Sequence, residues 1–138
     1  MFGKIFNSPT QTLLANALDG SALRNEVTAN NIANASTPDF KRSEVVFEEQ
    51  LRQLGVEQKQ PTPLRVTDPR HIQVGRSQRE FRPETHQLND VSYRNDDNNV
   101  DIDVETAKMI KNKLYYDAMG NSMTQEIRLL RLAITGRS

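Results

Sequence analysis

The chain contains no cysteine and no tryptophan, and only 6% of its 138 residues are aromatic. The absence of thiols excludes disulfide bonds, thiolate catalysis and zinc sites built on cysteine. With 36% hydrophobic residues and a mean hydropathy of -0.70, the chain has the length of one domain but the composition of a thin core. We therefore expect contacts outside a single chain to help hold it together.

An excess of charge of either sign is also missing, because 18 Lys and Arg residues balance 18 Asp and Glu residues. Binding to the phosphates of a nucleic acid requires an excess of basic residues, so a nucleic acid is not an expected partner. No apolar run approaches the roughly 20 residues of a membrane helix, and the first residues do not have the pattern of a cleavable signal peptide. We expect no direct membrane insertion and no export through a cleaved leader.

The first regular apolar pattern predicts a helix from Ser8 to about Asn34. Ser8 can act as its N-cap, and Pro9 suits the first helical position. The apolar positions cover more than half of the circumference, so this helix is expected to contact more than one neighbour. Its expected packing residues include Leu14, Leu18 and Val27.

A second long helix is predicted from Val104 to about Ile134. Asp101 or Asp103 can cap the free amides at its start, and Gly136 can end it. Its apolar positions drift around the helix, which is typical of helices that wind about each other. The expected packing residues of this helix are Val104, Ala107, Leu114, Ala118, Ile127, Leu130 and Ile134.

Between these helices, residues 37–99 contain all but one of the six prolines and only short mixed patterns. The sequences SEVVF, PLRVT and HIQVG predict short strands, and residues 48–54 predict a brief helical turn. The chain is thus expected to be mainly α and to form one structural domain. Its N-terminal (1–36) and C-terminal (100–138) assembly helices should pair with each other, and with other copies, as a coiled-coil-like bundle around an irregular middle segment.

Residues with the chemistry of an active site are sparse. His71 and His86 are the only imidazoles, and neither has the spacing of a metal ligand. The alternating polar run from Asp97 to Asp103 is similar to a calcium loop, but the required glycine and glutamate are absent from the sixth and twelfth positions. We therefore expect no catalytic, metal or cofactor site, and the aspartates are better explained as helix caps.

Asparagines are concentrated at the end of the first predicted helix, in the stretch TANNIANASTPDFKR (28–42). Asn30, Asn31 and Asn34 are three and four residues apart, so a helix would place them on one side. Carboxamides both donate and accept, which suits them to satisfy backbone groups of an adjoining segment. Pro38 forces Thr37 out of the helical region, and a helix stop with solvent-facing amides explains the same residues equally well.

The stretch TANNIANASTPDFKRSEVVFEEQL (28–51) resembles the N-terminal signature of the flagellar basal-body rod and hook proteins. That family shares an Ala-Asn-Asn-Ile-Ala-Asn core followed by Thr-Pro and an aromatic residue. PRHI (69–72) and NNVDIDVETAKMIKNKLYYDAM (98–119) are more similar to the short proximal-rod members than to the longer distal-rod and hook members. The signature residues, to which the resemblance gives a role in assembly, are Asn30, Asn31, Ile32, Ala33, Asn34, Thr37, Pro38 and Phe40.

One position departs from the family pattern. After Thr-Pro the family usually has Gly-Tyr, whereas this chain has Asp39-Phe40. If the backbone is left-handed there, aspartate costs roughly 1 kcal/mol that glycine would not. The sequence leaves the type of turn open.

The resemblance implies a structural subunit of the proximal rod of the bacterial flagellum, part of the drive shaft that carries torque from the motor to the hook and filament. It implies passage unfolded through the flagellar type III export apparatus and assembly in the periplasm. The implied partners are copies of the chain, other rod proteins, and MS-ring and rod-adaptor components. Another class also fits the residues, a cytosolic helical adaptor or chaperone that binds a partner through exposed apolar helix faces.

Overall fold

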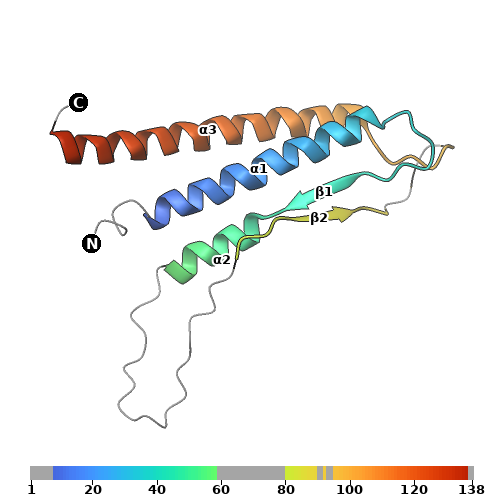
Figure 1. The fold of residues 1–138 in the computed structure, drawn as a ribbon. Helices are drawn as coiled ribbons and strands as arrows, with labels where there is room; N and C mark the ends of the chain where they lie inside the picture. Colours follow the sequence, from blue (N-terminus) through green and yellow to red (C-terminus); the bar gives the residue numbers. More distant parts are fainter. Residues whose placement is uncertain (1–7, 59–79, 90–91, 93–94, 137–138) are drawn as a thin grey trace, which may run out of the picture.

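The computed structural model describes residues 8–58, 80–89, 92 and 95–136. Figure 1 shows two long helices, α1 and α3, side by side and antiparallel, with a two-stranded ribbon and a shorter helix along the other side of α1. The predicted mainly α class with paired terminal helices and short middle strands is confirmed. The elements are α1 (Pro9–Ala33), β1 (Ser43–Val46), α2 (Glu48–Gln58), β2 (Glu84–Gln87) and α3 (Ile102–Thr135).

The start of α1 follows both predicted signals in position, with Ser8 as the N-cap residue and Pro9 in the first turn. Pro9 occupies the first helical turn, and Ser8 has extended backbone angles, φ -61° and ψ 133°. The Ser8 side chain makes no capping hydrogen bond. Its carbonyl oxygen instead accepts from the backbone N–H of Thr12, at 3.1 Å, so proline geometry begins this helix without a side-chain cap.

Both ends of α3 were predicted from local signals and are confirmed. The Asp101 carboxylate accepts from the backbone N–H groups of Asp103 and Val104, at 3.0 and 3.3 Å. Gly136 ends the helix with φ 62°, and its N–H donates to the Leu132 carbonyl at 2.8 Å. This left-handed position favours glycine because a Cβ would be strained there.

The sheet consists of β1 and β2, paired antiparallel with Ser43 opposite Gln87 and Val46 opposite Glu84. The strand predicted from SEVVF is therefore confirmed. Strand β2, with the sequence ETHQ, was not predicted, because all four of its residues are exposed and it has no apolar alternation. Helix α2 begins at Glu48 as predicted but continues to Gln58. The strands predicted from PLRVT and HIQVG lie outside the described residues.

The apolar core is small, as the composition predicts. Among the described residues its largest member is Phe47, whose ring lies against Gly20 of α1. The guanidinium carbon of Arg24 is 4.3 Å from the centroid of that ring, and Phe81 meets it edge-on with centroids 6.3 Å apart. Phe47 therefore anchors the β1–α2 segment on α1. The buried apolar residues are Ala17, Ala35, Val45, Phe47 and Val100.

The seam between α1 and α3 differs from the predicted one. The buried residues of α1 are small or polar, namely Ala17, Gly20, Ser21, Thr28 and Asn31. The buried residues of α3 are the polar Glu105 and Asn112. Leu14, Leu18 and Val27 of α1 are half-buried. In the single chain, the predicted packing residues Val104, Ala107, Leu114, Ala118, Ile127 and Ile134 are exposed and stay outside the seam with α1, and Leu130 is half-buried. Their predicted packing against other copies stays a prediction.

The helical period explains why these apolar residues miss the seam. At 100° per residue, Leu114 lies on the side of α3 opposite Glu105 and Asn112. Ile127 and Ile134 lie on the same side as Glu105, but near the end of α3 that runs past the start of α1 (Figure 1). Among the described residues, no helix has the length and apolar composition of a membrane span.

Candidate functional site

The end of α1, the start of β1 and the start of α3 meet at one end of the molecule (Figure 1). We call this place the amide junction and define it by Asn31, Asn34, Asn98, Asn99 and Glu105. These side chains come from segments more than sixty residues apart in the sequence. Four asparagines of the amide junction are buried or half-buried, namely Asn31 and Asn34 of the signature region and Asn98 and Asn99 of the NNVDID stretch.

Asn31 joins three elements. Its side chain is only 1% exposed. The amide nitrogen donates to the Ser43 carbonyl at 2.7 Å and to the Glu105 carboxylate at 2.9 Å, while the amide oxygen accepts from the Ser43 N–H at 2.9 Å. Asn31 thus pairs with the backbone of β1 as a neighbouring strand would, and simultaneously holds the start of α3.

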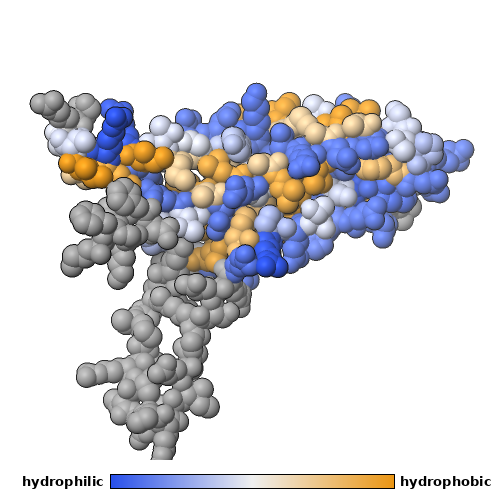
Figure 2. Space-filling model, in the orientation of Figure 1, coloured by the Kyte–Doolittle hydropathy of each residue, from blue (hydrophilic) through white to orange (hydrophobic). Residues whose placement is uncertain are grey.

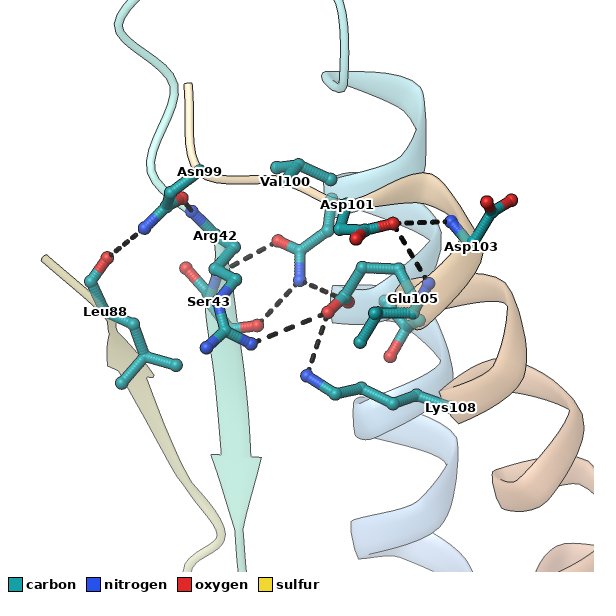
Figure 3. A network of polar contacts seen from close by, with 12 residues as sticks. Arg42, Ser43, Leu88, Asn99, Val100, Asp101, Asp103, Glu105 and Lys108 are labelled. Carbon is teal, nitrogen blue, oxygen red and sulfur yellow. Dashed lines mark hydrogen bonds and ion pairs between the residues drawn. The ribbon is translucent and has the colours of Figure 1, made fainter. Parts of the chain in front are cut away.

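Glu105 is the buried acid of this junction, with 2% exposure. Its carboxylate accepts from Lys108 Nζ at 2.9 Å and lies 3.8 Å from an Arg42 guanidinium nitrogen, as Figure 3 shows. A buried carboxylate is tolerated when charges and hydrogen bonds compensate its lost hydration. The burial of Glu105 could not be predicted from the sequence, because Asn31 and Arg42, which surround it, are distant in the sequence.

Asn98 closes the end of α1 from outside. It is fully buried, and its amide nitrogen donates to the carbonyl oxygens of Asn34, Ala35 and Thr37 at 2.9, 3.2 and 2.8 Å. Its amide oxygen accepts from the Val100 N–H at 2.7 Å. The last carbonyls of a helix have no partner within the helix, and Asn98 supplies additional donors to the end of α1 and to the turn that follows it.

Asn99 makes a second backbone bridge. Its amide oxygen accepts from the Arg42 N–H at 2.7 Å and its amide nitrogen donates to the Leu88 carbonyl at 2.8 Å, as drawn in Figure 3. The segment before α3 therefore ties together the residues that precede β1 and those that follow β2. This role was not predicted, since the same run was explained only by helix capping.

The three signature amides at the end of α1 differ in burial and in their partners. Asn30 is exposed, Asn31 is buried and Asn34 is half-buried. Asn34 donates to the Asn30 carbonyl at 2.9 Å and accepts from the Thr37 hydroxyl at 3.3 Å. Asn31 thus bridges segments, whereas Asn30 and Asn34 belong to the helix stop. Of the other signature residues, Ile32 and Phe40 are half-buried, and Ala33, Thr37 and Pro38 are exposed.

A second polar contact lies further along the seam. The Ser21 hydroxyl donates to the Asn112 amide oxygen at 2.9 Å, and the Asn112 amide nitrogen donates to the Ser21 carbonyl at 2.8 Å. Sliding α3 along α1 would leave these buried groups and Asn31 unpaired, and each unpaired group costs about 1–3 kcal/mol. Asn31–Glu105 and Ser21–Asn112 therefore fix the register of the two helices.

The turn after Pro38 is left-handed at Asp39, where φ is 59°, and the Asp39 N–H donates to the Asp96 carbonyl at 2.9 Å. This settles the type of backbone that the sequence left open. Asp97, in the facing segment, also has a positive φ of 55°. The two aspartates occupy a conformation that glycine adopts without strain.

We expect Asp39→Gly to raise the free energy of unfolding by up to about 1 kcal/mol, because glycine has no Cβ to strain at φ 59°. Asp39→Ala is the matched control and should lower it by about 1 kcal/mol, since alanine lacks the tolerance of aspartate for this region. Urea denaturation followed by circular dichroism measures both. An alanine variant as stable as the glycine variant would contradict the left-handed turn.

A groove of about 560 Å³ lies beside the junction, between β1, α1 and α3, with Arg24, Val45, Lys108 and Tyr115 among its lining residues. Arg24 donates to the Val45 carbonyl at 2.9 Å and pairs with Glu48 at 2.5 Å. Burial alone would raise the pKa of Glu48, but the hydrogen bond from Arg24, the backbone N–H groups of Phe47 and Glu48 and the charge of Arg24 together lower that pKa. These contacts link α1 to the β1–α2 segment rather than preparing a reactive group.

The residues considered for metal or acid–base chemistry are not gathered together. His86 is exposed on β2, with Nε2 3.4 Å from a Glu84 carboxylate oxygen. His71 lies outside the described residues. In the described part of the chain, no three His, Asp or Glu side chains are close enough together to hold a metal ion. The amide junction itself consists of amides that hydrogen-bond to backbone groups around one buried carboxylate.

Comparison with known proteins points to one family. A family model described as "Flagella basal body rod protein" matches residues 14–41, a range that includes Asn31 and Asn34 of the amide junction. The flagellar basal body rod protein FlgB of Bacillus subtilis is 30% identical over 132 residues, covering 96% of this chain and 97% of that protein. FlgB of Borreliella burgdorferi is 30% identical over 85% of this chain and 89% of that protein, and FlgB of Aquifex aeolicus is 30% identical over 83% and 84%.

Proposed function

The chain belongs to the FlgB family of flagellar basal-body rod proteins, and from this we propose that it is a structural subunit of the proximal rod. In that position it forms part of the drive shaft that transmits torque from the motor to the hook and filament. Its action is mechanical, because each subunit passes force to its neighbours through many shared contacts. The observation that carries the proposal beyond family membership is an uncovered apolar face on α3.

That face lies on the side of α3 opposite the seam. Ile110 and Leu114 lie about 140° and 180° from the direction of Glu105 and are 58% and 66% exposed, although both are large apolar side chains. Val104, at the edge of this face, is 47% exposed. Scattered exposed apolar residues are ordinary, but a row along one side of a helix marks an interaction surface. Because polar contacts fix α3 against α1, the helix cannot turn this row inward without unpairing Glu105 and Asn112. The row is left for neighbouring subunits.

A rod built of one kind of subunit requires contacts between two different faces of the molecule. Such contacts do not close on themselves, so they extend into a filament. The thin core of the single chain supports the same conclusion, since the apolar surface that a larger domain would bury internally is presented outward here.

The finer parts of the proposal follow from the family resemblance. We propose assembly with copies of the chain, with other rod proteins, and with MS-ring and rod-adaptor components. We also propose export by the flagellar type III apparatus without a cleaved signal peptide, and assembly in the periplasmic part of the basal body. No role for nucleic acid, a cofactor or catalysis is proposed.

Mass spectrometry of purified basal bodies tests the placement of the subunit. We expect the chain to co-purify with the basal body after the hook and filament have been removed. The alternative of a cytosolic adaptor or chaperone predicts the opposite distribution. Recovery of the chain from the cytosol, with none in the basal body, would overturn the rod proposal.

We expect Leu114→Glu to abolish swimming when it replaces the native chain, because it puts a charge into the proposed subunit contact. The stability of the isolated chain should change by no more than about 0.5 kcal/mol, since Leu114 is 66% exposed. Leu114→Met keeps an apolar side chain of similar volume and serves as the control that swims. Motility in soft agar measures both variants, and full swimming with Leu114→Glu would show that this face is not an interface.

A further inference from the structure

The last turns of α3 extend beyond the start of α1 (Figure 1). Ser21 contacts Asn112 across the seam. Both helices rise 1.5 Å per residue, so Pro9, about twelve residues before Ser21, lies about level with residue 124 of α3. We call residues 126–135 the overhang, because α1 does not extend alongside them.

One side of the overhang is an apolar strip between two opposite charges. At 100° per residue, Ile127, Leu130 and Ile134 lie within about 60° of one another. Glu126 flanks this strip on one edge and Arg131 on the other, each about 40° beyond the nearest apolar residue. Ile127 and Ile134 are 55% and 63% exposed, and Figure 2 shows hydrophobic side chains gathered over this end of the molecule. The overhang therefore presents apolar side chains with an acid on one edge and a base on the other.

The groove between β1, α1 and α3 has the inverse arrangement. Its volume of about 560 Å³ lies in the range of about 300–1,000 Å³ that is usual for ligand pockets. Lys111 lines it on the α3 side and Glu44 lines it on the β1 side. Its lining also includes Val46 and Tyr115, which are 47% and 53% exposed. The groove thus presents apolar side chains between a base on one wall and an acid on the other.

The charges on the groove walls are available to a partner. In the described part of the chain, neither Glu44 nor Lys111 forms an ion pair. Lys111 Nζ lies 5.9 Å from the centroid of the Tyr115 ring, whereas the neighbouring Lys108 is already held by Glu105 at 2.9 Å. Opposite charges beside exposed apolar side chains select a partner that has the opposite pattern.

We propose that the overhang of a second copy lies in this groove, with its apolar strip against the apolar lining. Glu126 of the overhang then lies beside the wall of Lys111, and Arg131 lies beside the wall of Glu44. Only one of the two directions of the docked helix along the groove gives this pairing. The reverse direction puts like charges together, so the charges determine the direction as well as the position of the helix.

The docked helix comes from another copy, because the overhang of a chain cannot reach its own groove. Tyr115 of the groove and Ile127 of the overhang belong to one helix and are separated by a rise of about 18 Å. The overhang and the groove are different faces, so their contact is heterologous. The contact deepens the proposed rod function, on which it rests, by naming two faces through which copies meet. It does not involve the row at Ile110 and Leu114.

The absence of cysteine allows a direct test, because an introduced cysteine is the only thiol of its chain. Chains with Tyr115→Cys are mixed with chains with Ile127→Cys and, as a control, with chains with Leu129→Cys. Ile127 and Leu129 are 55% and 53% exposed, but they face directions about 160° apart on the helix. A disulfide needs Cα atoms within about 7 Å, so we expect positions 115 and 127 to be joined at least about tenfold faster than positions 115 and 129.

Oxidation of the purified full-length variants at high micromolar concentration is followed on non-reducing gels and by mass spectrometry of the joined peptides. A fast disulfide between positions 115 and 127 of two chains is the expected result. Equal rates for the two mixtures would overturn the proposal, because the overhang would then not turn its apolar strip to the groove. Faster joining of position 127 to position 127 would also overturn it, since the overhang would then pair with a second overhang.

Charge reversal tests the direction of the docked helix. Glu126→Lys in the chain with Ile127→Cys, or Lys111→Glu in the chain with Tyr115→Cys, should slow the disulfide by about threefold or more. Both reversals together should restore the rate, because the two charges are then opposite again. Arg128→Glu is the control and should leave the rate unchanged, since Arg128 lies outside the apolar strip and its two edges. Slowing without rescue by the double reversal would overturn the proposed pairing.

Co-purification with the basal body is a separate measurement. A chain that is found in the basal body but forms no disulfide between positions 115 and 127 would refute this contact and leave the rod proposal standing. A chain that forms the disulfide but is absent from the basal body would refute the rod proposal and leave the contact between copies.

Discussion

Replacing Asn98 with aspartate is expected to lower the free energy of unfolding by about 3 kcal/mol or more, the cost of a buried charge without a partner. The Asn98 amide nitrogen donates to three backbone carbonyl oxygens and is fully buried. A carboxylate of the same shape cannot donate, and it would face these oxygens with a negative charge. Since small domains are stable by only about 5–15 kcal/mol, the change would remove a large part of the total.

Urea denaturation at neutral pH, followed by circular dichroism, measures this loss. Asn95→Asp is the matched control, because Asn95 is exposed in the same segment and should change stability by no more than about 0.5 kcal/mol. Asn98→Ala should lie between the two, since it removes the donors without burying a charge. Similar stabilities for the Asn98→Asp and Asn95→Asp variants would show that Asn98 does not close the end of α1.

The stability lost in the Asn98→Asp variant should increase as the pH rises. Burial and the facing carbonyl oxygens would raise the pKa of the introduced carboxyl above its unfolded value of about 3.9. The protonated form can donate one hydrogen bond, so the defect should be smallest at acidic pH and grow as the pH rises through the raised pKa. The control variant at Asn95 should show no such growth.

Replacing Phe47 with alanine is the second change with a large expected effect, a loss of about 3–5 kcal/mol. Phe47 is 5% exposed, and it joins the β1–α2 segment to α1 through Gly20 and Arg24. Few other apolar side chains are buried in the described part of the chain, so nothing nearby can refill the space. Thermal and urea denaturation measure the loss.

The contact between Phe47 and Gly20 predicts opposite results for two helical glycines. A Cβ at Gly20 would lie 2.7 Å from the Phe47 ring, whereas a Cβ at Gly120 has no such neighbour within 4 Å. Gly120→Ala should raise the free energy of unfolding by about 0.5–1 kcal/mol, because alanine has the higher helix propensity. Gly20→Ala should destabilise by about 1–3 kcal/mol, because overpacking outweighs the same propensity gain.

A double-mutant cycle identifies the cause. In a Phe47→Ala background the ring is gone, so Gly20→Ala should become neutral or stabilising. If Gly20→Ala is equally harmful in both backgrounds, Phe47 is not the reason that glycine is required there. Gly120→Ala should give the same gain with or without Phe47.

The helix limits, the left-handed stop at Gly136 and the strand at SEVVF could be predicted because their causes lie within a few residues. Pro9 fixes its own φ, the Asp101 carboxylate reaches N–H groups two and three residues on, and Gly136 carries no Cβ. The family signature could be recognised for a similar reason, since its residues are close together in the sequence. β2 was missed because a fully exposed strand has no apolar alternation.

The sequence by itself determined that two long amphipathic helices flank a proline-rich middle, and that the amides near Asn31 belong to a family of rod subunits. Only the tertiary structure decided which amides are buried, because Asn31 and Asn98 find their partners on segments distant in the sequence. It also decided that α3 turns Glu105 inward and Leu114 outward. Periodicity shows that a helix has an apolar side, but the pairing of buried polar groups determines whether that side faces the chain's own core or a neighbour.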